Sequence, residues 1–266
     1  MPYLPPFLRT ALSGWFRIDA FDESTPSAPV WRDLSGRGND LVGALGVSYP
    51  GRFDGVTVFV GPNLSAFMSG SNGSVLVAAR PDDIVASTAT VTNQDCLWCS
   101  GIVAGAYLRD NAGVRTYTVQ NGDGAADNQV ITPANGLPDG EVAIFMWSHE
   151  GGATLYGSVD DLLKGSVASG VTTSLANPFR LGLNNAGTAG FTGRIFEVLV
   201  FDDTFIDEKL SQIINYLSAN WTRAGILSAR RAAERAAGCG SSAGLRSCRP
   251  CARCRSTCWT WSCSPM

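Results

Sequence analysis

The residues best suited to chemistry in this chain are its cysteines, and six of the eight lie near the C-terminus. Four of them follow the spacing of a bacterial iron–sulfur motif, Cys248-x2-Cys251-x2-Cys254-x3-Cys258, although Trp259 stands where that motif has proline. The tail offers no second cysteine set and no core to shield a cluster. Its composition fits a disordered basic tail or a frame-shifted extension better. Disulfides or a metal used in assembly are the alternative.

The other two cysteines, Cys96 and Cys99, form a C-x-x-C at the start of an expected strand. A redox pair of this kind normally stands in a βα context, which is missing here. We therefore interpret the pair as two buried thiols.

Acid–base chemistry has few candidates. The only histidine, His149, ends an expected strand, and no G-x-S-x-G nucleophile motif lies near it, so we predict a surface or turn histidine. Glycoside hydrolysis usually needs two carboxylates, whereas Glu197 is the only acid in the strand expected over residues 195–201. We interpret Glu197 as structural, and we expect no catalytic residue, no cofactor and no metal site.

Polar loop residues offer a way to bind glycans. Planar polar side chains on loops, combined with aromatic rings, are typical of sugar sites. The candidate glycan-binding residues are Asp110, Asn111, Asn121, Asp123, Asp127 and Asn128. Four rings lie nearby in the sequence, at Trp98, Tyr107, Tyr117 and Trp147, and for each of them core packing is the preferred interpretation.

Short apolar runs separated by turn signals must position these residues. Such runs, without helical patterns between them, favour a β-sandwich over a parallel α/β sheet. The expected strands are Thr57–Val60, Ser74–Ala79, Leu97–Gly105, Arg115–Gln120, Val142–Ser148, Ala153–Ser158, Phe179–Leu183 and Ile195–Phe201.

One amphipathic helix follows the last strand, over residues 207–220. Its apolar residues recur at helical spacing and must face the sheet: Leu210, Ile213, Ile214, Leu217 and Trp221. Thr204 with Asp207 three residues later resembles a capping box.

Charge divides the chain into regions with different roles. Residues 1–222 carry 12 basic and 22 acidic side chains, whereas residues 223–266 carry eight arginines and one glutamate. We predict an extended arm over 1–12, one domain over 13–222, and a basic, Cys-rich tail over 223–266 with a short helix at 224–237. No apolar stretch is long enough for a membrane span, and the prolines near the N-terminus argue against a secretion signal.

Three segments together match a known family. Trp31–Asn39, with the sequence WRDLSGRGN, resembles the W-x-D-x-S-G-x-G-N signature of concanavalin A-like lectin/glucanase (laminin G-like) domains. Arg52–Gly55 resembles the F-D-G turn of that family, and Phe191–Asp202 with the following helix resembles its closing strand. The resemblance implies an all-β, antiparallel jelly-roll sandwich (concanavalin A-like) with a C-terminal capping helix. In the first segment, Asp33, Ser35 and Asn39 are turn formers, too few to indicate calcium.

The resemblance extends to domains of bacteriophage virion proteins. We therefore expect a non-enzymatic structural or adhesion component of a phage-like virion: a head decoration, head fibre or tail adhesin assembled in the host cytoplasm. The alternative is a cellular carbohydrate-binding module. Expected partners are the chain itself as a homo-oligomer, other virion proteins and a cell-surface polysaccharide, but no nucleic acid and no membrane.

The N-terminal arm is the candidate assembly element. Its prolines hold it extended, and its apolar side chains should not remain in water. The candidate assembly residues are Tyr3, Leu4, Phe7 and Leu8. Packing of the arm back onto its own domain is the alternative.

Overall fold

A computed structural model of the chain describes residues 4, 6–22, 28–43, 51–70, 72–82, 95–101, 104–111, 114–122, 127–133, 140–151, 153–160, 163–168, 173–188 and 190–236. Contacts divide the chain into two units, residues 1–226 and 227–266. In the second unit, only the backbone of residues 227–236 is described, and it is helical.

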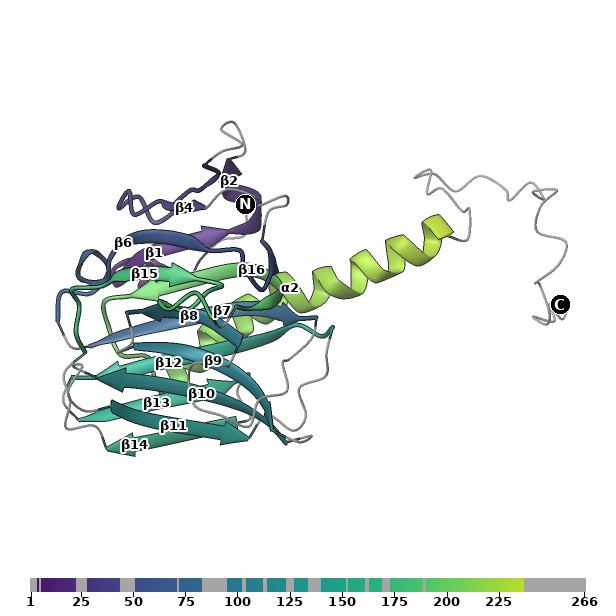
Figure 1. Cartoon of the computed structure of the whole chain (residues 1–266). Helices are drawn as coiled ribbons and strands as arrows, with labels where there is room; N and C mark the ends of the chain where they lie inside the picture. The colour runs from purple at the N-terminus through teal and green to yellow at the C-terminus, as the bar shows by residue number, and fades with distance from the viewer. Residues whose placement is uncertain are drawn as a thin grey trace, which may run out of the picture. The chain divides into compact units, whose positions relative to one another are not determined.

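The described strands form two antiparallel sheets that pack face to face (Figure 1). The seven-stranded sheet contains β1 (Leu12–Arg17), β16 (Thr192–Phe201), β7 (Gly73–Pro81), β12 (Ala143–Glu150), β13 (Thr154–Val159) and β14 (Leu163–Ala168) in that order, with β5 (Arg52–Asp54) paired to β16. The nine-stranded sheet contains β11 (Asp127–Pro133), β10 (Val114–Gly122), β9 (Ala104–Asn111), β8 (Asp95–Ser100), β15 (Pro178–Leu181), β6 (Phe59–Asn63), β4 (Leu41–Gly43), β3 (Val30–Trp31) and β2 (Phe21–Asp22). The predicted all-β sandwich is confirmed.

The main core lies between the two sheets. Alternate residues of each strand face it, as in β7, where Val75 and Val77 point inward while Leu76 points to the other side. Aromatic rings from both sheets meet here, and Trp98 packs edge-on against Trp147 with ring centroids 5.3 Å apart. Burial of such large apolar surfaces is the main favourable term in folding.

A second core covers the outer face of the seven-stranded sheet. The part of helix α2 (Asp207–Ala236) from Leu210 to Trp221 packs here against the outward residues of β7, β12 and β16 (Figure 1). The predicted apolar stripe is confirmed, because four of its members are buried and Trp221 packs against them at the margin: Leu210, Ile213, Ile214 and Leu217. The helix continues without a break to Ala236, so the separate helix predicted over 224–237 is part of α2.

The described part of the N-terminal segment, residues 4 and 6–12, is not an extended arm. Pro6–Arg9 is a single helical turn, α1, and Leu4 and Leu8 are fully buried in the second core. The expectation of an apolar arm waiting for a neighbour is therefore wrong for Leu4 and Leu8, since their own domain provides the apolar surface that they need. Tyr3 lies outside the described residues, and Phe7 is described only as part of α1.

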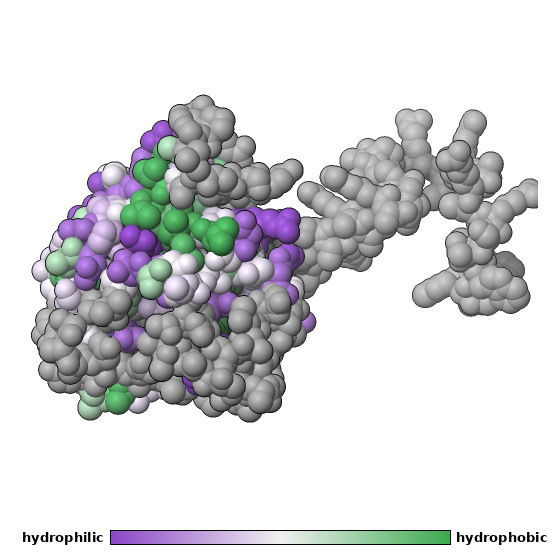
Figure 2. Space-filling view, viewed as in Figure 1, coloured by the Kyte–Doolittle hydropathy of each residue, from purple (hydrophilic) through white to green (hydrophobic). Residues whose placement is uncertain are grey.

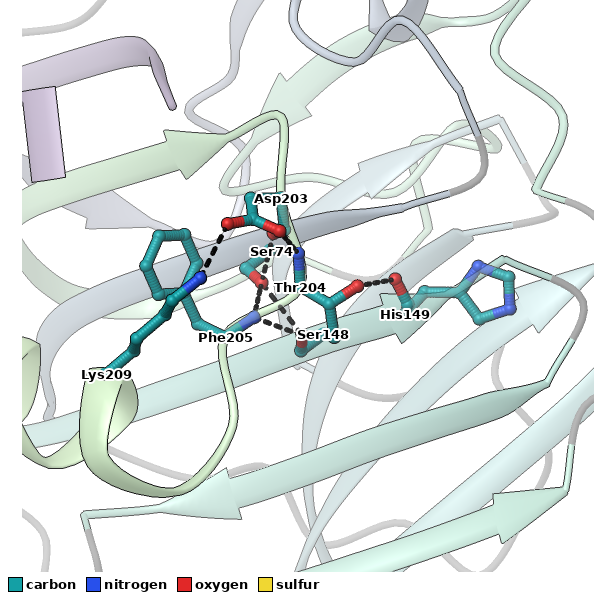
Figure 3. A network of polar contacts seen from close by, with 7 residues as sticks. All are labelled: Ser74, Ser148, His149, Asp203, Thr204, Phe205 and Lys209. Carbon is teal, nitrogen blue, oxygen red and sulfur yellow. Dashed lines mark hydrogen bonds and ion pairs between the residues drawn. The ribbon is translucent and has the colours of Figure 1, made fainter. Parts of the chain in front are cut away.

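A polar network holds the connection between β16 and α2 against the sheet (Figure 3). The hydroxyls of Ser74 and Ser148 lie 2.8 Å apart on neighbouring strands, and the backbone N–H of Phe205 donates to both. Ser74 in turn donates to the carbonyl of Asp203 at 2.8 Å. These bonds satisfy backbone groups that the chain leaves unpaired where it changes from strand to helix.

Thr204 has a different role from the predicted one. Its hydroxyl donates to the carbonyl of His149 at 2.8 Å, which ties the connection to β12 (Figure 3). The helix begins only at Asp207, so Thr204 does not cap it. Lys209 from the first turn of α2 pairs with Asp203 at 2.9 Å instead.

No described helix is long and apolar enough to cross a membrane. The six cysteines of the tail, with the iron–sulfur spacing, lie outside the described residues.

We predict that Leu217→Asp destabilises the domain by more than the about 2–5 kcal/mol typical of a buried Leu→Ala change. Leu217 is fully buried between α2 and the sheet, so the variant places a charge there without a partner. Urea unfolding followed by circular dichroism measures the effect. Asn215→Asp, at an exposed position on the same helix, is the control and should change the unfolding free energy little. Equal losses in the two variants would contradict the docking of α2.

Candidate functional site

Glu197 is a buried carboxylate under α2, and three side chains donate hydrogen bonds to it. The indole N–H groups of Trp15 and Trp221 each lie 2.6 Å from its oxygens, and the Tyr216 hydroxyl lies 3.1 Å away. Arg17 stacks over the Trp221 ring, with 5.4 Å between the guanidinium carbon and the ring centroid. All the donors come from β1 and α2, so Glu197 joins the closing strand to its neighbours.

A β-bulge places Glu197 there. The pairing of β16 with β7 shifts between Ile195 and Glu197, so that Ile195 faces the main core while Glu197 faces the helix. Burial raises the pKa of Glu197, and the hydrogen bonds from Trp221, Trp15 and Tyr216 offset part of that rise. Its hydrogen bonds to two side chains of α2 and one of β1 suit the group to holding the helix on the sheet.

His149 is fully buried, so the predicted surface or turn histidine is wrong. It belongs to β12, and its ring faces the interior of the sandwich. The amide nitrogen of Asn121 lies 2.9 Å from Nε2, and the hydroxyl of Thr173 lies 3.1 Å from Nδ1. Thr173 also donates to the Asn121 side-chain oxygen at 2.6 Å. Three polar groups from three segments thus close a ring of hydrogen bonds.

This ring of hydrogen bonds fits a neutral imidazole. With Thr173 donating to Asn121, it accepts from Nδ1–H of His149, and Nε2 accepts from the amide of Asn121. A neutral histidine satisfies every bond, whereas a second ring proton would face the Asn121 donor. The network links β10 of one sheet to β12 of the other, so its role is to hold the two sheets together.

Asp33, in the W-x-D-x-S-G-x-G-N segment, organises its own loop. Its carboxylate accepts from the backbone N–H groups of Trp15, Ser35 and Asn39, at 2.9 to 3.0 Å, and from the Ser35 hydroxyl at 2.8 Å. The amide of Asn39 donates to the carbonyl of Ser13 at 2.9 Å. Asp33, Ser35 and Asn39 therefore act as turn formers, as predicted from the sequence.

The candidate glycan-binding residues do not form one cluster. Asp110 and Asn111 end β9 at one end of the β9–β10 hairpin. Asn121 pairs in register with Asn128 at the opposite end of β10, beside Asp127. Asn121 is buried in the His149 network, which leaves its amide unavailable to a glycan. Asp123 lies outside the described residues.

The four rings near those residues are buried, as predicted. Trp98, Tyr117 and Trp147 belong to the main core. Tyr107 lies on the opposite face of its sheet, where it contacts Cys96 and Cys99, and both of these thiols are free and buried as expected.

The outer face of the nine-stranded sheet differs from that of the other sheet, because no described helix packs on it. Val30, Val42 and Val60 lie side by side on β3, β4 and β6 on this face, and Val42 is 46% exposed. Figure 2 shows apolar atoms gathered over this part of the molecule. Arg180 of β15 continues the row next to Val60. This strip of adjacent apolar side chains bordered by a cation is the best candidate binding surface among the described residues.

Several solved structures are similar to this chain in fold. The binding domain of paraclostridial mosquitocidal protein 1 has a TM-score of 0.54 at 8% identity, over 78% of this chain and 52% of that one. Domain 4 of AbnA, an extracellular arabinanase of Geobacillus stearothermophilus solved with arabinotriose, has 0.50 at 14% identity, over 77% and 98%. A Trypanosoma rangeli sialidase has 0.54 at 15% identity, over 80% and 33%.

At these identities the likeness shows the fold alone. The chain spans about half of the mosquitocidal binding domain and a third of the sialidase, but almost all of the arabinanase domain. No family model matches the chain, and a search of curated proteins found no match.

We predict that Glu197→Gln destabilises the domain by about 1–3 kcal/mol at acid pH, because the amide NH₂ would face an indole donor. The folded pKa of Glu197 is raised, so the stability that its protonation adds is present below the unfolded pKa and is lost as pH rises through the folded pKa. The difference between wild type and variant should therefore narrow as pH rises from 4 to 8.

Denaturant unfolding at a series of pH values measures this difference. Glu141→Gln, at an exposed position, is the matched control and should show no such trend. A difference that grows with pH would mean that Glu197 is more stable as a carboxylate in the folded protein than in the unfolded chain.

Proposed function

We propose that this domain is a non-catalytic carbohydrate-binding module. Its supporting observation is the contrast between the two outer sheet faces: α2 covers one, while the other presents the row of Val30, Val42 and Val60. Sugars offer apolar C–H faces as well as hydroxyls, and an apolar strip with polar groups at its border suits both.

The fold supports the same proposal. The arabinanase domain that matches over 98% of its length was solved with arabinotriose, which gives an oligosaccharide-binding precedent for a sandwich of this size. The described chemistry agrees with binding, because Glu197 and His149 are both engaged in holding elements together.

Carbohydrate binding was the alternative interpretation of the sequence, and we now prefer it to a virion role. An apolar arm free to join a neighbour was one of the features that favoured the virion hypothesis. Leu4 and Leu8 are buried in their own domain, which removes that argument. A place in a virion, and partners among virion proteins, stay predictions of the sequence.

We predict that Val42→Asp weakens oligosaccharide binding at least about tenfold, since a charge in the apolar strip removes the surface on which a sugar would pack and keeps water there. Arabinotriose, sialyllactose and cellotriose are the probes, and isothermal titration measures their affinities. Val56→Asp is the matched control, because Val56 is 73% exposed and lies in the turn between β5 and β6 rather than in the row of strip residues.

Equal binding by the two variants would remove the strip from the proposal. Absence of binding to all three probes and to a broader glycan panel would overturn the proposed function itself. Release of reducing sugar from any of them would identify an enzyme instead.

A further inference from the structure

The C-x-x-C pair owes its geometry to a β-bulge. In the pairing of β8 with β9, Cys96 lies opposite Tyr107 and Cys99 lies opposite Gly105. Three residue steps of β8 therefore match two steps of β9, and the register shift falls between Cys96 and Trp98. Residues two steps apart in a strand point to the same face at a spacing of about 6.6 Å. The bulge thus places both cysteines on one face, where regular alternation would separate them.

The two sulfurs meet on that face. Cys96 and Cys99 are both fully buried and free, and they form a cluster with Tyr107. The Cys96 thiol donates a hydrogen bond to the sulfur of Cys99, which donates to the carbonyl of Leu183 at 3.7 Å. Burial raises the pKa of Cys96, whereas the hydrogen bond from Cys96, with the charge of Arg180, lowers that of Cys99.

A ring and a cation lie on the two sides of the sulfurs. On the β9 side, the hydroxyl of Tyr107 reaches back over Gly105, where a Cβ atom would come within 2.7 Å of it. On the β15 side, Arg180 lies opposite Cys99, and its Nε is buried without a hydrogen-bond acceptor. A buried, unsatisfied guanidinium N–H beside two thiols is unusual, because such a donor costs free energy unless it meets an acceptor.

Two thiols that meet on one face of a strand can hold an ion between them. A disulfide needs Cβ atoms about 3.5–4.5 Å apart, whereas residues on one face of a regular strand are spaced at about 6.6 Å. Metal–thiolate bonds of about 2.3 Å place two sulfurs on opposite sides of an ion about 4.6 Å apart. A direct bond and a bound ion are therefore the two alternatives for this pair, and the test below separates them.

We propose that Cys96 and Cys99 bind one soft monovalent metal ion, Cu(I), between their sulfurs. Thiolates are the ligands that select Cu(I) among biological metals. Among the described residues, no group of three or more His, Cys, Asp or Glu is placed to hold an ion. Two sulfurs alone can complete the coordination shell of an ion that takes two ligands.

Binding balances in protons and charge. Cu(I) replaces the two thiol protons, which leave to solvent, and no electron is transferred. The resulting bis-thiolate complex carries one negative charge. Arg180 supplies the compensating positive charge, and its free Nε–H gains a thiolate acceptor. The ion site shares Arg180 with the border of the valine strip, but it needs no bound carbohydrate.

The test uses the full-length chain with its six tail cysteines replaced by serine, which leaves Cys96 and Cys99 as the only thiols. Cu(I) is supplied anaerobically as its acetonitrile complex and titrated in competition with the chelator bathocuproine disulfonate. We expect one equivalent of Cu(I) per chain, a thiolate-to-copper absorption band in the ultraviolet and a raised melting temperature. Cys99→Ser in the same background should abolish all three.

Arg180→Gln tests the role of the cation separately. Residues that support metal ligands from behind typically contribute about 10–100-fold to affinity, and we expect a loss of that size. Arg37→Gln, at an exposed position elsewhere, is its control.

The result for the tail-serine protein decides the proposal without the other variants. If this protein is folded by circular dichroism and takes no Cu(I) from the chelator, the proposal is overturned. Loss of both thiols on exposure to air without copper would assign the pair to disulfide formation and would overturn it as well.

Discussion

The architecture depends on covering the outer face of the seven-stranded sheet. Strands β7, β12 and β16 carry apolar side chains on both faces, so the main core accounts for only part of their burial. Without α2, side chains such as Leu76 and Leu199 would face water. Leu4 and Leu8 pack into the same second core, so this part of the N-terminal segment belongs to the domain.

Polar groups fix the position of α2 on the seven-stranded sheet. Glu197 accepts from Trp15 on β1 and from Trp221 on α2, and the Ser74–Ser148 pair holds Phe205 where the helix approaches. Apolar packing alone would allow α2 to slide along the sheet, whereas directional hydrogen bonds define one position. This division leaves the nine-stranded sheet as the face on which a ligand can lie, which is why the proposed binding surface is there.

Sequence reasoning succeeded where periodicity was strong. The stripe from Leu210 to Leu217 predicted both the helix and its buried face, and the strands over Ser74–Ala79 and Ile195–Phe201 fall within β7 and β16. It failed where contacts between residues distant in sequence decide the structure. Residues 97–105 were predicted as one strand, but they include the end of β8 and the start of β9, two strands that pair antiparallel. Nothing local to His149 indicates that Asn121 and Thr173 would bury it, and no simple alternation reveals that a bulge brings Cys96 and Cys99 to one face.

Two of the chemically distinctive positions owe their orientation to a single extra residue in a strand. The register shifts before Glu197 and between Cys96 and Trp98 each turn the following side chains over by one face. The extra residue is therefore the position at which each strand can change in length without exchanging its faces. Deletion of Phe196 would remove the bulge and leave Ile195 and Glu197 opposite Ala79 and Ala78 as they are now, whereas deletion of a regularly paired residue such as Val198 would exchange inside for outside along one part of β16. In an alignment, a gap at the extra residue of β8 or β16 would keep the two faces of the sheet, while a gap elsewhere in these strands would mark a change of architecture.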